Sequence, residues 1–373
     1  MPLRCISPAG QELAFQHDTE SWAALRARNL AEKHLRLPCC ESPVVLKQSR
    51  LGTRFFAHRR RDACTSAPES QEHLHLKDIV ARAATRAGWF VTTEGRGTSS
   101  TGQEWVADVL CSREGTSRSV AFEIQWTRQS LEDTFQRQQR YQASGIRALW
   151  LMRQWDVPVS KETPAFAVRI GEGSGAEVLM PSGIWPANNV LHLMGRAEPR
   201  WGQRVALDAF TAGALRGRLR FAPAVGHVVP ARVIGAPTTC WKCKRPTCLL
   251  LGLELLLDRA YPGFGNAYVE LNAIGSDPQR GAQWLSVHLA AEALKANGVG
   301  AVKARYSKTR GETYLSNGCV HCDVLQGSFF DHDVIDDQTS LFEADVPVEP
   351  WLAESSDEPA VLNRWWFDPT TSS

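Results

Sequence analysis

A chain of 373 residues is long enough for two or three domains, and its content of 43% hydrophobic and 22% charged residues is ordinary for a soluble globular protein. The sequence has no run of about 18 apolar residues, which excludes a membrane-spanning helix, and its first residues lack the apolar core of a signal peptide. The net charge of +2 is unevenly divided along the chain. Residues 331–373 hold eleven Asp and Glu against one basic residue. Residues 1–330 carry 41 Lys and Arg against 29 Asp and Glu, a net charge of +12.

The basic charge of residues 1–330 favours a polyanionic partner, because neutralising phosphates releases counterions and drives binding to nucleic acids. A solvated, mildly basic surface without such a partner is the alternative. Ten cysteines in a chain without an export signal indicate metal binding or packed thiols rather than disulfides. We therefore expect a cytoplasmic protein that is not attached to a membrane. The sequence identifies no protein partner.

Residues 1–69 are predicted to form an N-terminal region with a candidate zinc knuckle. Cys39, Cys40, His58 and Cys64 place three thiols and one imidazole within 26 residues, and Zn²⁺ binds both kinds of side chain. Adjacent cysteines rarely chelate one ion with good geometry. The sequence therefore leaves open whether these four residues bind zinc.

The segment 70–153 is predicted to alternate helices and strands. Its first helix is amphipathic, because Leu76, Val80 and Ala83 share one face and Gly88 stands where a helix should end. Its strands are apolar and rich in β-branched and aromatic residues. The predicted elements are helices over 72–88 and 131–144, and strands over 89–93, 105–110, 120–126 and 147–152.

Two carboxylates on neighbouring predicted strands are the most informative feature of this segment. Asp108 lies in Trp-Val-Ala-Asp-Val-Leu and Glu123 in Val-Ala-Phe-Glu-Ile-Gln-Trp, and a polar turn between them allows a hairpin that brings both side chains together. Neighbouring buried carboxylates repel unless a cation binds them, and Mg²⁺ is held by one or two carboxylates plus substrate phosphates. The alternative is that both lie on the solvated face of an antiparallel hairpin.

The order of helix, three strands, helix and strand resembles the core of the restriction-endonuclease-like, or PD-(D/E)xK, nucleases. The residues also resemble a narrower family, the nuclease domain of CoiA-like competence proteins. The resemblance covers about residues 37–153. Its motifs are Phe55-Phe-Ala-His58, Glu72-His73, Lys77, Glu94, Ala107-Asp108-Val109, Phe122-Glu123-Ile124-Gln125, Arg137, Tyr141, Gly145 and Leu149-Trp150-Leu151. The family's Cys-Pro-x-Cys is Leu37-Pro38-Cys39-Cys40 here, so its first zinc ligand is missing.

The resemblance implies a restriction-endonuclease-like mixed sheet flanked by helices, with Mg²⁺ or Mn²⁺ as the catalytic metal and DNA as the partner, RNA not being excluded. The implied catalytic residues are Asp108, Glu123, Gln125 and Glu94, of which Asp108 and Glu123 bind the metal. Gln125 stands where the superfamily has Lys. The implied nucleic-acid-binding residues are Lys77, Arg137 and Tyr141.

Beyond a mixed connecting region over 154–239, two C-x-x-C pairs predict a second metal site. Cys240, Cys243, Cys319 and Cys322 supply four thiolates, the tetrahedral set that structural Zn²⁺ prefers. The residues over 240–330 are therefore predicted to form a zinc-ribbon-like domain, with a helix over 283–297 as an insertion. The alternative is two unrelated pairs of buried cysteines. Residues 331–373 are predicted to be an acidic, partly disordered tail.

Two functions of different kinds follow from these predictions. The first is a magnesium-dependent deoxyribonuclease acting in DNA uptake, defence or processing. The alternative is a catalytically inactive nucleic-acid-binding protein that retains the nuclease fold and the zinc ribbon. The carboxylate set of Glu94, Asp108 and Glu123 is complete, which favours the nuclease.

Overall fold

The computed structural model of the protein describes residues 2–59, 64, 69–127, 129–154, 160–181, 201–223, 225–327, 337–349, 351 and 364–370. The chain forms two compact units. Unit 1 is Met1–Pro181 with Trp201–Arg220, and unit 2 is Ser182–Arg200 with Phe221–Ser373.

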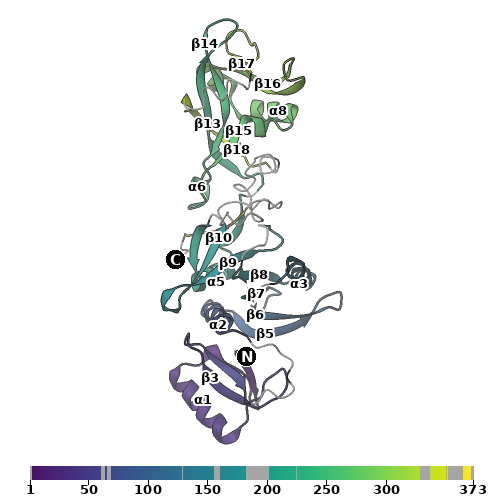
Figure 1. Cartoon of the computed structure of the whole chain (residues 1–373), viewed down its shortest axis with the longest axis vertical. Coiled ribbons are helices and arrows are strands. Elements are labelled where there is room, and N and C mark those ends of the chain that lie inside the picture. The colour runs from purple at the N-terminus through teal and green to yellow at the C-terminus, as the bar shows by residue number, and fades with distance from the viewer. Residues whose placement is uncertain are drawn as a thin grey trace. The chain divides into compact units, whose positions relative to one another are not determined.

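Unit 1 is built around one large sheet and two small hairpins (Figure 1). Its strands and α-helices are β1 (Arg4–Ser7), β2 (Gly10–Leu13), α1 (Thr19–Glu32), β3 (Val44–Gln48), β4 (Arg54–His58), α2 (Gln71–Arg86), β5 (Phe90–Thr98), β6 (Glu104–Ser112), β7 (Ser119–Gln125), α3 (Leu131–Ala143), β8 (Arg147–Met152), β9 (Ala165–Ile170), β10 (Ala176–Pro181), β11 (Trp201–Ala206) and α5 (Leu207–Leu215).

The large sheet of unit 1 has seven strands in the order β11-β10-β9-β8-β7-β6-β5. Strands β7, β8 and β9 run parallel, and the other neighbours are antiparallel. Helices α2 and α3 pack on either side of this sheet (Figure 1). A central mixed sheet flanked by helices confirms this part of the predicted fold class. The sheet also continues through β9, β10 and β11, beyond residue 153, where the sequence predicts that the core ends.

Helices α2 and α3 begin where serine residues cap them. The side chain of Ser70 accepts a hydrogen bond from the backbone N–H of His73, and Ser130 accepts one from Asp133. These caps satisfy backbone donors that a helix leaves free at its start. Both helices start and end within two residues of the positions predicted from their apolar spacing.

Glu94, Asp108 and Glu123 lie on the three neighbouring strands β5, β6 and β7 and are called the carboxylate row. Thr93 pairs with Val109 and Gly95 with Ala107, so Glu94 stands opposite Asp108. The pairing of β6 with β7 ends at Val109 and Phe122, and Asp108 and Glu123 are the next residues beyond it. The predicted hairpin therefore forms, and β5 adds the third acid.

Unit 2 has a second sheet, in the order β17-β16-β14-β13-β18, with β15 also paired to β14. Its core contains Leu253, Leu255, Trp284 and Val346. Its strands and α-helices are β13 (Val228–Thr239), β14 (Pro246–Leu255), α6 (Leu257–Ala260), β15 (Ala267–Glu270), α7 (Leu271–Ile274), α8 (Pro278–His288), α9 (Ala291–Ala296), β16 (Val299–Ser307), β17 (Glu312–Cys319), β18 (Thr339–Pro347) and β19 (Arg364–Phe367).

One prediction for unit 2 differs from the structure. The single helix predicted over 283–297 is two helices, α8 and α9, because the chain is extended at Leu289 between them. The described part of the acidic tail contains β18, which pairs with β13, and β19, which pairs with β12 (Leu219–Ala222), so partial disorder of the tail stays a prediction. Apolar side chains explain the order, because Val346 and Trp366 belong to the buried core of unit 2. Residues 328–336, 350, 352–363 and 371–373 of this region lie outside the described residues.

In the part of the chain that the structure describes, no helix is both long and apolar enough to span a membrane.

Candidate active site and metal centres

Asp108 is the centre of a polar cluster between the sheet and α2. Its Oδ1 lies 3.1 Å from Nε2 of His73 and 3.8 Å from Nζ of Lys77, and its Oδ2 accepts a hydrogen bond of 2.9 Å from the backbone N–H of Ile124. Burial alone would raise the pKa of this carboxyl, but His73, Lys77 and the Ile124 N–H together hold it well below its usual range. Asp108 is therefore a carboxylate at neutral pH.

Lys77 carries a positive charge into this cluster from α2. Its side chain has no exposed surface, and its ammonium donates to Glu94 and, at 2.7 Å, to Glu69. Burial would lower the pKa of Lys77, but the carboxylates of Glu94, Glu69 and Asp108 raise it above its ordinary value. His73 and Lys77 lie one turn apart on α2 and so share one helix face, which explains why both reach the same acids.

Glu94 has an unusual backbone and an unsatisfied oxygen. Its φ of 49° lies in the left-handed region, which non-glycine residues adopt at a cost of about 1–3 kcal/mol. Arg4 of β1 donates to the Glu94 carbonyl at 3.0 Å and so helps to fix this conformation. One carboxylate oxygen of Glu94 binds Lys77, whereas Oε2 is buried without a hydrogen-bond partner among the described residues.

Glu123 is held by α3 rather than by the Asp108 cluster. Its side chain is 1% exposed, Arg137 forms an ion pair with it, and the Tyr141 hydroxyl donates to it. Burial raises the pKa of Glu123 to about 8, with a further rise from the nearby charge of Asp108 and a partial opposing effect of Arg137. The guanidinium of Arg137 also lies 5.0 Å from the ring centre of Trp150.

The predicted site residues thus divide between two helices. Glu94 and Asp108 meet Lys77 on the side of α2, whereas Arg137 and Tyr141 contact Glu123. Lys77 is fully buried and Tyr141 is 1% exposed, so the partners seen here are carboxylates of the same chain. Direct contact of Lys77, Arg137 or Tyr141 with a nucleic acid stays a prediction. Gln125 donates from its amide to the Thr127 carbonyl at 2.6 Å.

Sequence analysis did not single out Glu69, which belongs to the same site. Donor atoms of Glu69, His73 and Asp108 all lie within 4.8 Å of one another. Lys77 connects the segment that precedes α2 with β6, because its ammonium lies 2.7 Å from Glu69 and 3.8 Å from Asp108. The available signal was the repeated spacing of four residues, from Glu69 just before α2 to His73 and from His73 to Lys77 on the helix.

The donor set fits a hard divalent cation. Carboxylate oxygens are the ligands that Mg²⁺ and Mn²⁺ prefer. Asp108 is ionised, Glu69 and His73 lie beside it, and the unpartnered Oε2 of Glu94 has an unused acceptor position. Asp108 with Glu94 and Glu69 are therefore the residues that could hold such an ion. Glu123 would need to lose the proton that its raised pKa favours.

The four cysteines of unit 2 come together in a cluster of tetrahedral size. Their sulfurs all lie within 4.8 Å of one another, with 3.8 Å between Cys240 and Cys322 and 3.7 Å between Cys243 and Cys319. Four sulfurs about 2.3 Å from a central ion would be about 3.8 Å apart. Burial would raise the pKa of Cys240, but N–H groups of Cys243 and Lys242 lower it to about 6, which favours the thiolate.

The N-terminal cysteines form a second cluster. Sulfur atoms of Cys39, Cys40 and Cys64 and a ring nitrogen of His58 lie within 4.8 Å of one another. Cys39 lies 3.6 Å from both Cys40 and Cys64, and Cys40 lies 3.3 Å from Nε2 of His58. The adjacent cysteines, which sequence reasoning regarded as poorly placed for one ion, both reach the cluster.

The same backbone turn supports all the C-x-x-C-like segments. In each, the residue four positions after the first returns a hydrogen bond to its carbonyl: Lys244 to Cys240, Asp323 to Cys319, and Glu41 to Leu37. Each of these donors also has a positive φ. Leu37 thus occupies the position that the first cysteine has in the other two turns, and the sulfur of Cys39, one residue before Cys40, lies in the cluster.

Residues 69–164, which are 96 of the chain's 373 residues, match a family model described as "Competence protein CoiA, nuclease-like domain". The match begins at Glu69 and includes Asp108, Glu123 and Tyr141. It confirms, for this segment, the resemblance to CoiA-like competence proteins. No curated protein and no solved structure matched the chain.

Proposed function

We propose that this chain, whose residues 69–164 match the CoiA nuclease-like domain, is a metal-dependent nuclease that hydrolyses phosphodiester bonds in DNA. The observation that carries the proposal is the acidic cluster within the matched segment. It combines an ionised Asp108, the neighbouring Glu69 and a buried Glu94 oxygen that has no hydrogen-bond partner among the described residues. Buried carboxylates gathered in this way are characteristic of cation sites. The role would be DNA uptake, defence or processing.

In this proposal Asp108, Glu94 and Glu69 hold Mg²⁺ or Mn²⁺. The ion supplies an activated water and offsets the charge that builds on the phosphate. The backbone N–H of Ile124 and the ring of His73 fix the direction of the Asp108 carboxylate, so that it is presented in one orientation. The amide of Gln125 cannot take a proton at neutral pH, so its role is limited to orienting water or a phosphate oxygen.

Lys77 acts in this proposal as an internal counter-charge. Its ammonium contacts Glu94 and Glu69 and stands 3.8 Å from Asp108, so it reduces the repulsion among the acids before a cation binds. At Glu123, Arg137 supplies the counter-charge and the Tyr141 hydroxyl donates a hydrogen bond. These three residues position the carboxylates and are not themselves placed on the substrate.

The test is cleavage of plasmid, linear and single-stranded DNA with and without Mg²⁺ or Mn²⁺. Wild-type protein should cut only with metal, and Asp108→Ala should reduce cleavage below detection while DNA binding in Ca²⁺ remains. Asp345→Ala is the matched control, because Asp345 is exposed in unit 2 and has no ion pair among the described residues. Cleavage by Asp108→Ala at the wild-type rate would contradict the proposal.

One observation favours the second candidate function, a catalytically inactive nucleic-acid-binding protein. Glu123 is almost completely buried, has a pKa raised to about 8 and is bound by Arg137 and Tyr141, so it is not presented to a cation in this state. If wild-type protein binds DNA but cuts none of the three substrates with either metal, this second function is supported.

We also propose that both cysteine clusters bind structural Zn²⁺. The supporting observation is the spacing of the donor atoms, 3.3–3.8 Å between the measured pairs, which suits a tetrahedral ion. Folding of the turns around them would then depend on the metal.

A further inference from the structure

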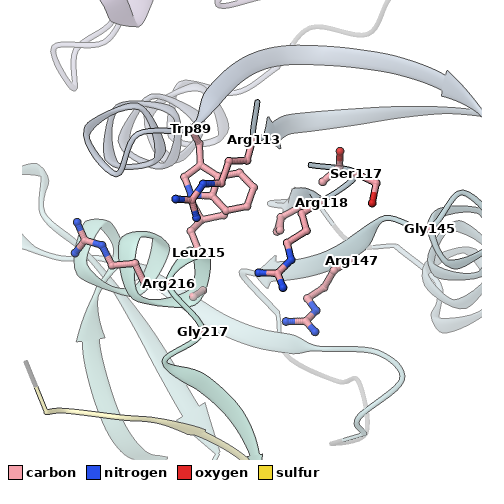
Figure 2. Close-up of a pocket in the computed structure, with 12 residues that line it drawn as sticks. Trp89, Arg113, Ser117, Arg118, Gly145, Arg147, Leu215, Arg216 and Gly217 are labelled. Carbon is pink, nitrogen blue, oxygen red and sulfur yellow. The ribbon is translucent and has the colours of Figure 1, made fainter. Parts of the chain in front are cut away.

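A second polar region of unit 1 is a pocket of about 590 Å³ beside the first residues of β7 and β8, at one end of the strands of the large sheet (Figure 2). It is lined by the start of β7 and β8, by the turn between β6 and β7, and by the end of α5. Four of its twelve lining residues are arginines: Arg113, Arg118, Arg147 and Arg216. No lining residue is Asp or Glu.

The arginines of this pocket have no acidic partner in the part of the chain that the structure describes. Among the described residues, no side chain forms an ion pair with Arg113, Arg118, Arg147 or Arg216, although many other arginines of the chain are paired. Figure 2 shows the guanidinium groups of Arg118 and Arg147 extended in similar directions. Like charges repel, so a pocket of this composition is set up to bind an anion.

The side chains favour phosphate groups over bases. Guanidinium groups bind phosphate through two parallel N–H donors, and the hydroxyls of Ser117 and Ser119 are further donors at the same pocket. The aromatic residue, Trp89, is only 8% exposed and offers little surface on which a base could stack. Contacts made here would therefore be independent of base sequence.

The pocket lies on the same strands as the carboxylate row. At the pocket, β5 begins at Phe90, β6 ends at Ser112 and β7 begins at Ser119. On each strand the acid of the carboxylate row is four residues away: Glu94 on β5, Asp108 on β6 and Glu123 on β7. Four residues of a strand span about 13 Å. This length corresponds to about four base pairs of B-form DNA at 3.4 Å per nucleotide of one strand.

We propose that the arginine pocket binds the phosphodiester backbone of the nucleic acid whose scissile phosphate lies at the carboxylate row, about four nucleotides away. This rests on the proposed nuclease function and adds a second, sequence-independent contact to it. The two contacts would hold the substrate along the direction of β5, β6 and β7.

The test compares two double variants of the full-length chain. Arg118→Gln with Arg147→Gln removes two charges from the pocket, and Arg26→Gln with Arg50→Gln removes two exposed charges elsewhere in unit 1. Binding of a fluorescent 30-base-pair duplex is measured by anisotropy in Ca²⁺ between 50 and 200 mM salt. The pocket variant should bind about 10-fold or more weakly, with the slope of log K against log salt reduced by about 1.8, which is 0.9 per lost phosphate contact. The control variant should bind as wild type does.

Equal binding of the 30-base-pair duplex by the pocket and control variants would overturn the inference, as would an absence of duplex binding by wild type. Stronger competition by a mononucleotide than by the duplex would also overturn it, because the pocket would then be a nucleotide site.

Binding in Ca²⁺ is independent of cleavage, so the two proposals can fail separately. Cleavage by wild type with unchanged binding by the pocket variant would reject the arginine pocket alone. Loss of binding by the pocket variant with no cleavage by wild type would reject the nuclease alone.

Discussion

Lys77 places a charge in a fully buried position, and its partners are all carboxylates. Such a charge is tolerated only because Glu94 and Glu69 bond to it directly. Removing the ammonium leaves these acids beside Asp108 without their internal counter-charge. Contacts with three acids of the same chain therefore explain the buried position of Lys77, and its contact with DNA stays a prediction.

We predict that Lys77→Met lowers the free energy of unfolding of unit 1 by about 3–5 kcal/mol, the range for breaking a buried ion pair. Urea denaturation followed by fluorescence measures the change. Lys303→Met is the matched control, because the Lys303–Asp323 pair is 50% exposed on both sides and should be worth at most about 1 kcal/mol. Equal losses in the two variants would show that the Lys77 cluster contributes no more than a surface pair.

Glu123 leads to a prediction about pH. Its pKa rises from 4.5 to about 8 on folding, so the folded protein binds this proton more tightly than the unfolded chain does. Its contribution to stability is complete below pH 4.5 and is lost as the pH rises towards 8. In Glu123→Gln this loss cannot occur. Between pH 5 and pH 8 the wild type should therefore lose more unfolding free energy than Glu123→Gln does. Denaturation at several pH values measures both losses. A difference between the two proteins that is the same at every pH would contradict the raised pKa.

At the scale of single residues, sequence patterns predicted which acidic side chains belong to the site better than they predicted which residues contact those side chains. Asp108 and Glu123 were predicted as neighbours because strand alternation and one turn determine their register. The attachment of Glu123 to Arg137 and Tyr141 depends on how α3 packs, which periodicity along one segment does not encode. Glu69 was missed because it precedes its helix, outside the predicted apolar pattern.

At the scale of elements, a glycine allows β5 and β6 to lie close together beside the site. A Cβ atom at Gly97 would be 2.1 Å from the Trp105 ring on the paired strand. That ring lies 5.4 Å from the ring of Tyr141 and donates from its nitrogen to Ser144 at 2.9 Å. Gly97 is therefore linked through the Trp105 ring to Tyr141, the residue that donates to Glu123.

We predict that Gly97→Ala lowers the free energy of unfolding by about 1–3 kcal/mol, because the added methyl group displaces the Trp105 ring. Cleavage should fall in parallel if Tyr141 moves with it. Gly175→Ala is the control: Gly175 has no atom within 4 Å of the added methyl and an ordinary negative φ, so its change should stay within about 0.5 kcal/mol. Thermal unfolding and the plasmid assay give both values. Unchanged stability of Gly97→Ala would show that the strands can separate without cost.

Helices and strands were predicted correctly where one clear local pattern, such as a cap or a run of apolar residues, marks the segment. Helices α2 and α3 have caps and apolar spacing that the sequence displays, and β8 was predicted with its observed bounds. The ordering of β18 and β19 was not predicted, because composition suggested an acidic tail, whereas pairing with β13 and burial of Trp366 decide the structure. Such long-range pairing is not visible in local charge.

At the scale of the whole molecule, the two cysteine clusters belong to different units. Cys39, Cys40, His58 and Cys64 lie in unit 1, and Cys240, Cys243, Cys319 and Cys322 lie in unit 2. The second cluster was predicted from two short motifs 75 residues apart, since C-x-x-C spacing is specific enough to pair distant segments. The division of the chain was not predicted, because residues 201–220 return to unit 1 after an intervening segment of unit 2.

We predict two zinc ions per chain in protein purified without added metal, measured by elemental analysis. Cys243→Ser should lose one ion and destabilise unit 2, while the metal content of unit 1 and the Mg²⁺-dependent assay change little. Cys111→Ser is the control, because Cys111 is a buried thiol outside both clusters and should keep two ions. A chain without zinc, or with freely titrating thiols at both clusters, would contradict the prediction.

The attachment of each acid to a different part of unit 1 has a consequence for the order of events during protein synthesis. Arg4 contacts the Glu94 backbone, Lys77 contacts Glu94 and Glu69, and Tyr141 contacts Glu123, so the earliest and the latest of these residues are 137 positions apart. A ribosome must therefore release the chain beyond α3 before the acids can take their final partners. A truncated product ending before α3 would lack Arg137 and Tyr141, so Glu123 would be left without the partners that hold it in the folded chain.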